Sequence, residues 1–282
     1  SVETVAVQGI VAEAAKVEIR DAGKVTIKAN GDASAIHASG ADAVVKITTA
    51  SGDETVRLEA TGATDKAVLH ADNGAKVEID GKVKIVETNG NEAIKVGKGA
   101  EVVIGGGEIG SENADVAICI EDNGKIAINQ NRLHKVVTNG DIVFVEAQPN
   151  AGADSVVRKA IYATKDSVHN GYIVNNTDTK KDFAVEFSKG AQWNGGAQGM
   201  NLDVLLSGDG TAWIGNYDET TVLDLQIEDG ATWKVQDKIA TFAMTANTTN
   251  VATMKGEGGF VEMGADAMNI EKYSGSTTFI YK

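Results

Sequence analysis

Residues 190–233 read GAQWNGGAQGMNLDVLLSGDGTAWIGNYDETTVLDLQIEDGATW, a stretch in which the phrase Gly-x-x-Trp occurs three times. Its tryptophans, Trp193, Trp213 and Trp233, are the only three in the chain and are equally spaced along the sequence. Upstream positions keep the same spacing, namely Val185, Leu205 and Leu225 and likewise Phe187, Ser207 and Ile227. A repeat of this length is typical of a solenoid, in which each turn buries its apolar face only against its neighbours.

Two shorter phrases alternate through the rest of the chain. The first, Gly-x-x-Val-x-Ile or a close variant, begins at Gly23, Gly74, Gly81, Gly99 and Gly124. The second, Ala-Ile-x-Ala or a variant, has its leading apolar residue at Ile36, Leu69, Ile94, Ile118, Ile161 and Val185. Five intervals separate successive residues of this second series, and three of them are nearly equal. The interval from Ile36 to Leu69 is longer, and the interval from Ile118 to Ile161 fits two turns of the coil. Each phrase predicts a short strand with alternating faces that follows a turn.

The two phrases together predict an all-β fold, a right-handed parallel β-helix of roughly a dozen rungs. Valine, isoleucine and threonine are frequent, and β-branched residues favour strands. Asn-Gly pairs, such as those at Asn73 and Asn123, supply corner conformations. Residues 146–158, which contain the single proline Pro149, and residues 175–182 have few core positions and predict longer loops.

Composition narrows the range of partners and cofactors. The net charge is −14 and the pI is about 4.7, so a nucleic-acid partner is not expected. A single cysteine, Cys119, excludes an internal disulfide framework and a cysteine-based zinc site. No cofactor is predicted, and no apolar run is long enough to predict a transmembrane helix.

The C-terminal part carries a likeness to a known family. It runs from Gly230-Ala231-Thr232-Trp233 through Gly258-Gly259-Phe260-Val261 to Tyr273-Ser274-Gly275-Ser276. This order resembles the autochaperone end of passenger domains of type V autotransporters, in the pertactin-like adhesin group. The resemblance implies a β-helix passenger segment over residues 1–229 and an autochaperone-like cap over residues 230–282.

The resemblance also implies a function. Such a passenger is a secreted virulence factor and adhesin, held on the outer-membrane surface of a Gram-negative bacterium by its own membrane barrel, which would lie beyond Lys282. Its implied partners are a receptor or glycan of host cells or matrix, and a second rod through self-association. The chain lacks Gly-Asp-Ser-Gly and Gly-Asp-Ser-Leu motifs, and we do not expect an enzyme. Two alternatives stay open: a stalk that displays an N-terminal head, and a polysaccharide-degrading β-helix enzyme.

The middle residue of each Ala-Ile-x-Ala phrase is expected to point outward when the isoleucine points inward. These residues are predicted to form one line along the solenoid: His37, His70, Lys95, Cys119, Tyr162 and Glu186. His37 and His70 could share a metal ion, but no third ligand is visible, so the sequence assigns no metal site. A solvated polar face is favoured, and an outward Cys119 would be a reactive thiol.

The tryptophan series has two interpretations. Inside the coil it is a core ladder, which is the favoured interpretation, and outside it is a platform that stacks on sugar rings. The candidate ligand-binding surface therefore comprises Trp193, Trp213, His37, His70 and Tyr162. A catalytic pair is not expected from Asp203 and Asp224, because their separation exceeds the tryptophan spacing by one residue and they need not align.

Overall fold

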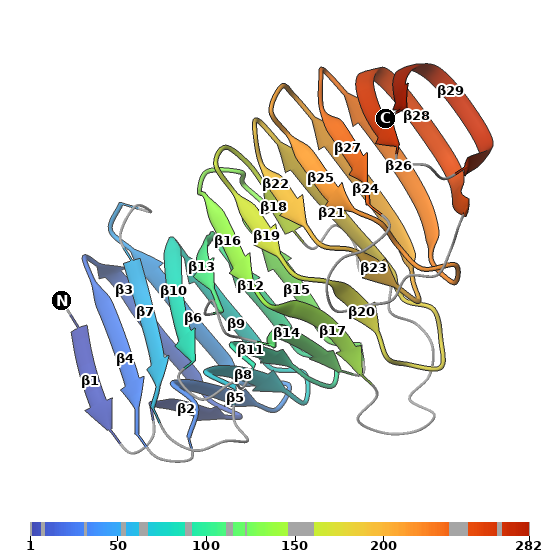
Figure 1. Ribbon diagram of the computed structural model, residues 1–282. Helices are drawn as coiled ribbons and strands as arrows, with labels where there is room; N and C mark the ends of the chain where they lie inside the picture. Colours follow the sequence, from blue (N-terminus) through green and yellow to red (C-terminus); the bar gives the residue numbers. More distant parts are fainter. Residues whose placement is uncertain are drawn as a thin grey trace. The chain divides into compact units, whose positions relative to one another are not determined.

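The computed structural model describes residues 2–6, 9–30, 33–51, 55–61, 67–87, 92–110, 115–121, 123–145, 161–236, 248–263 and 267–281 (Figure 1). The chain divides into two compact units, Ser1–Ser155 and Val156–Lys282. Regular structure in the described ranges is β-strand, and no helix there is long and apolar enough to cross a membrane. Strands within each unit pair in parallel, which confirms the predicted all-β parallel β-helix.

The described part of the first unit consists of short strands. They are β1 (Val2–Ala6), β2 (Ile10–Glu13), β3 (Lys16–Ala22), β4 (Val25–Ala29), β5 (Ile36–Ser39), β6 (Val44–Thr49), β7 (Thr55–Ala60), β8 (Leu69–Asp72), β9 (Lys76–Asp80), β10 (Lys82–Glu87), β11 (Ile94–Val96), β12 (Glu101–Ile104), β13 (Gly107–Ile109), β14 (Val116–Glu121), β15 (Lys125–Ile128), β16 (Val136–Asn139) and β17 (Asp141–Val145).

Three ladders organise this unit, because each strand pairs in parallel with the third strand after it. One ladder is β2-β5-β8-β11-β14-β17, the second is β3-β6-β9-β12-β15, and the third is β1-β4-β7-β10-β13-β16. Each turn of the coil therefore contributes one strand to each of three faces. A side chain on one strand lies beside its equivalents on the preceding and following turns.

The core of the first unit consists of aliphatic columns at matched positions in the three ladders. They are Ile36-Leu69-Ile94-Ile118-Ile142, Ile27-Leu58-Ile85-Ile109 and Ile47-Ile79-Ile104-Ile128. All of these side chains are buried. Burial of each isoleucine or leucine contributes roughly 1.5–3 kcal/mol, so stacking of the turns supplies the stability that a single turn lacks.

The first three intervals of the Ala-Ile-x-Ala series are confirmed as single turns of the coil, since Ile36, Leu69, Ile94 and Ile118 pair in succession. The long interval after Ile118 contains an intermediate strand, β17, whose Ile142 pairs with Ile118. Ile161 pairs instead with Val185 in the second unit. The prediction of two turns between Ile118 and Ile161 is therefore wrong, because Ile161 belongs to a different sheet from Ile118 and Ile142. The intermediate phrase, Asp141-Ile142-Val143-Phe144, was not recognised because it lacks the leading alanine of the others.

The second unit begins with short strands and ends with two long ones. They are β18 (Ile161–Ala163), β19 (Val168–Asn170), β20 (Ile173–Asn175), β21 (Asp182–Ser188), β22 (Gln192–Asn194), β23 (Ala197–Gln198), β24 (Asn201–Ser207), β25 (Ala212–Gly215), β26 (Val222–Glu228), β27 (Thr232–Val235), β28 (Thr248–Met263) and β29 (Ala267–Tyr281). Strand β28 pairs with both β26 and β27, so it spans two faces of the coil in one strand.

The three tryptophans form a column inside the second unit. Trp193 pairs with Trp213 and Trp213 with Trp233, on β22, β25 and β27. The ring centroids are 4.6 and 4.9 Å apart, with interplanar angles of 5° and 9°. Each indole Nε1 donates a hydrogen bond to a glycine carbonyl, at 3.1, 3.0 and 3.0 Å for Gly171, Gly195 and Gly215 respectively. The register predicted from the equal spacing of the tryptophans is therefore confirmed for this column.

The register predicted for the neighbouring strands is wrong by one residue. Val185 pairs with Val204, not with Leu205, and Phe187 pairs with Leu206, not with Ser207. The corner between β24 and β25 holds one residue more than the corner between β21 and β22, and this residue absorbs the difference. A shift of one residue exchanges the two faces of a strand, so Leu206 is buried whereas Leu205 is only half-buried.

The same shift aligns the two aspartates that the sequence separated, because Asp203 pairs with Asp224. The loop predicted at residues 175–182 is confirmed between β20 and β21, where the Asn175 side chain donates to the carbonyls of Thr179 and Gly199. The loop predicted at residues 146–158 lies outside the described residues. The boundary between residues 229 and 230 stays a prediction.

Candidate functional site

The tryptophan column is core, which corrects its place in the candidate ligand surface. Trp193 and Trp213 are 0% exposed, as is Trp233. Each ring is covered by its neighbours in the column, and each polar N–H is bound to a backbone carbonyl. These rings cannot stack on a sugar, so the core interpretation holds for all three.

The line of residues predicted from the Ala-Ile-x-Ala phrases exists over four rungs of the first unit, where its first three side chains are half-buried and its fourth is buried. His37 pairs with His70, His70 with Lys95, and Lys95 with Cys119, on β5, β8, β11 and β14. Tyr162 and Glu186 pair with each other on β18 and β21 of the second unit, so the prediction of one line through six residues is corrected. Tyr162 is half-buried.

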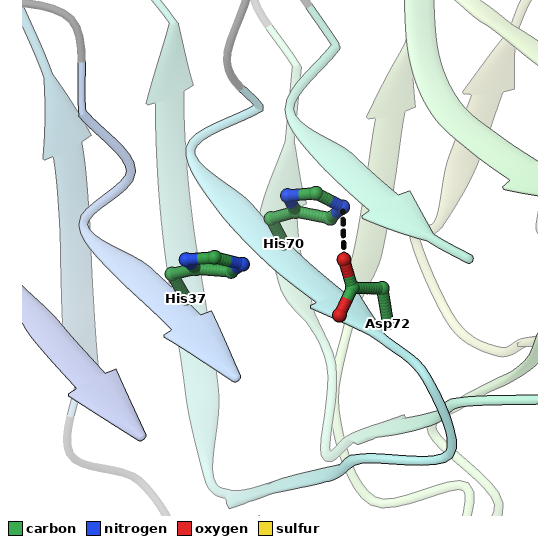
Figure 2. A group of neighbouring side chains, drawn as sticks. All are labelled: His37, His70 and Asp72. Carbon is green, nitrogen blue, oxygen red and sulfur yellow. Dashed lines mark ion pairs between the residues drawn. The ribbon is translucent and has the colours of Figure 1, made fainter. Parts of the chain in front are cut away.

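The two histidines stack face to face. Their ring centroids are 5.0 Å apart and their planes differ by 12°. Figure 2 shows both rings pointing the same way, with the Asp72 carboxylate beside the ring tip of His70. The distance from His70 Nε2 to Asp72 Oδ2 is 3.7 Å. One ligand atom from each of the three residues lies within 4.8 Å of the others, and all three side chains are half-buried.

The Asp72 carboxylate is oriented by the corner that follows it. Asn73 adopts φ 51°, in the left-handed region. From there its Nδ2 donates to Asp72 Oδ1 at 3.0 Å and to Ser39 Oγ at 3.1 Å on the preceding rung. Gly97 lies beside Asp72 on the following rung, where a Cβ would come within 3.2 Å of the Asp72 Cβ. Glycine therefore leaves space around the carboxylate.

Burial and neighbouring charges act in different ways on His70 and Lys95. Burial lowers the pKa of His70, although the Asp72 carboxylate acts in the opposite direction. The adjacent Lys95 pairs with Glu121 at 2.7 Å. Partial burial disfavours the Lys95 charge, but the hydrogen bond to Glu121 and the negative charge of that carboxylate together outweigh burial and raise the pKa of Lys95. The lysine charge is thus neutralised by Glu121 within the same ladder.

Cys119 ends this line in a buried position, so the outward orientation that would make it a reactive thiol is not present. Its exposed fraction is 5%, and burial raises the pKa of the thiol to about 12. A thiol with so high a pKa is almost entirely protonated at neutral pH and therefore a poor nucleophile.

A second feature of the first unit is a hollow of about 280 Å³ across β7, β10, β13 and β16. Its rim includes Lys82, Lys84, Lys135 and Glu108, and Lys84 pairs with Glu108 at 2.7 Å. Gly107, at the start of β13, is one of the lining residues; its φ is 114°, and a Cβ there would come within 2.0 Å of the Val83 carbonyl oxygen, so glycine permits the close approach of β13 to β10. A lysine-rich hollow contrasts with the chain's net charge of −14.

Sequence reasoning missed Asp72 and the hollow, although each has a signal. Asp72 follows His70 by two positions, and residues two apart on a strand share a face. Lys82 and Lys84 are likewise two positions apart and share a face, and the run Gly105-Gly106-Gly107 marks a close approach of neighbouring rungs. Comparison with family models, with curated proteins and with solved structures gives no match.

Proposed function

We propose that the chain is part of an autotransporter-type passenger on the surface of a Gram-negative cell, and that it acts as an adhesin through the side of its β-helix. The resemblance of residues 230–282 to an autochaperone end supports the passenger assignment. The observation that carries the adhesive part is the lysine-rich hollow over β13.

The chemistry of the hollow suits an acidic glycan of host cells or matrix. Lys82, Lys84 and Lys135 supply cationic donors around one depression. Hydrogen bonds to charged groups contribute roughly 1.5–3 kcal/mol each, so a few of them hold a sugar carboxylate weakly but specifically. Many chains displayed on one cell would add such contacts as avidity.

The experiment measures binding of the purified chain to cultured epithelial cells and to an array of glycans and matrix proteins. The test variant combines Lys84→Gln with Lys135→Gln. Lys46→Gln is the matched control, because Lys46 pairs with Glu78 at 2.9 Å and its side chain is 38% exposed, against 2.7 Å and 43% for Lys84.

We expect saturable binding that favours acidic glycans and weakens about tenfold or more in the double variant, since each charged hydrogen bond contributes roughly 1.5 kcal/mol or more. The control should bind as the unaltered chain does. Absence of binding to every surface would favour the stalk instead. Cleavage of the bound glycan would favour the polysaccharide-degrading enzyme.

A further inference from the structure

We infer that His37, His70 and Asp72 form a site for one divalent transition-metal ion of the zinc class, which joins the consecutive rungs β5 and β8 (Figure 2). Among the residues that the structure describes, this is the one group of three histidine, cysteine or acidic side chains close enough to share an ion. The inference does not depend on the adhesive function.

The donor set selects the ion. Two imidazoles and one carboxylate match the ligands of zinc and its neighbours, whereas calcium and magnesium prefer an all-oxygen shell. Three protein ligands leave a fourth position of a tetrahedral ion for water. The half-burial of all three side chains gives that water access to solvent.

The distances are close to those of a bound ion. Zinc lies about 2.0–2.2 Å from nitrogen and oxygen ligands, so ligand atoms in a tetrahedral site are roughly 3.3 Å apart. The 3.7 Å between His70 Nε2 and Asp72 Oδ2 needs a closure of only a few tenths of an ångström. All three ligand atoms lie within 4.8 Å of one another, and a tilt of the His37 ring out of the stack would turn its nitrogen toward the ion.

Stacking of parallel rungs accounts for the histidine pair but not for the position of the Asp72 carboxylate beside it. Parallel rungs in register place like residues beside each other, so a histidine pair at 5.0 Å follows from the pairing of β5 with β8. The carboxylate at the ring tip is an addition to that pairing. Asn73 holds it through a hydrogen bond of 3.0 Å, and such outer contacts commonly orient metal ligands.

The test is calorimetric titration of the whole chain with zinc chloride, with magnesium chloride as the comparison ion. The variants are His37→Gln, His70→Gln and Asp72→Asn, and the matched control is Asp80→Asn, an exposed strand aspartate on β9 of the same unit. The other two histidines, His134 and His169, are buried at 7% and 2% exposure, so imidazole-dependent binding reports on the proposed site. Circular dichroism confirms that each variant is folded.

We expect one zinc ion per chain, with no comparable heat from magnesium. Either histidine variant should abolish binding. Asp72→Asn should weaken it about 10–100-fold or more, because loss of even an outer contact has that effect on metal sites. Asp80→Asn should bind normally. A visible spectrum of the Co²⁺-loaded chain with the intense bands of a four-coordinate ion gives a measurement that needs no variant.

Three results would overturn the inference: no zinc heat in the unaltered chain, zinc binding that persists in both histidine variants, or equal binding of zinc and magnesium. In each case the histidine pair would be a packing contact between rungs.

Discussion

Replacement of Trp213 by alanine should remove the central ring of the tryptophan column in the second unit. The ring lies between Trp193 and Trp233, at 4.6 and 4.9 Å, and is 0% exposed. Truncation of a buried tryptophan costs about 3–5 kcal/mol, and the Gly195 carbonyl loses the hydrogen bond of 3.0 Å that the indole donates. The expected loss of unfolding free energy is about 5 kcal/mol, a large share of the roughly 5–15 kcal/mol of a whole domain.

The measurement is urea unfolding followed by far-ultraviolet circular dichroism. Trp213→Phe keeps an aromatic ring in the column but loses the indole hydrogen bond, so a smaller loss of about 2 kcal/mol is expected. This variant keeps the test informative where Trp213→Ala does not fold. Val222→Ala, at a 37% exposed position of β26, should change stability by only about 0.5 kcal/mol.

A Trp213→Ala chain as stable as Val222→Ala would show that burial of this ring does not stabilise the second unit. The same burial limits what Trp213→Ala can report about binding. A loss of cell binding in that variant would follow from damage to the core. The double variant of the hollow, Lys84→Gln with Lys135→Gln, is therefore the better probe of adhesion.

Two further predictions concern ionisable groups in the first unit. Because burial raises the pKa of Cys119 to about 12, its thiolate fraction at pH 8 is about one part in ten thousand and rises about tenfold per pH unit. Ellman's reagent should therefore label the folded chain far more slowly than the denatured chain. Equal labelling rates would contradict the burial of this thiol. Burial opposes ionisation of Glu59, but hydrogen bonds from Lys28 and Arg57 outweigh it and lower its pKa. A lowered carboxyl pKa stabilises the fold above the ordinary value of about 4.3 and ceases to do so as pH falls through the folded value. Glu59→Gln should therefore cost about 1 kcal/mol at pH 7 and less at pH 3 in urea unfolding, and a constant difference would argue against the ion pair.

The fold class could be predicted from the sequence because a solenoid repeats its core pattern along the chain. The first intervals of the Ala-Ile-x-Ala phrase and the equal spacing of the tryptophans each correspond to a turn of the coil in the structure. The pairing of His37 with His70 followed from the same rule, since parallel rungs in register place equivalent positions side by side.

The strand register and the inward or outward direction of side chains depended on the lengths of the corners between strands, which the intervals of the repeat do not resolve. One additional residue between β24 and β25 moved Leu206 inward and aligned Asp203 with Asp224. Alternation alone could not decide whether Trp213 faced the core, because a strand pattern defines two faces without saying which one the coil encloses.

What the sequence by itself determined is the repeat, and with it a parallel β-helix in which His37 lies over His70. Only the tertiary structure decided that the tryptophans are inside, that Cys119 is buried, that Asp72 meets the histidine pair, and that three lysines line one hollow. The physical reason is that a period fixes which residues are neighbours along the coil. The conformations of the corners and the side chains on adjacent faces fix which way those residues point and what they meet.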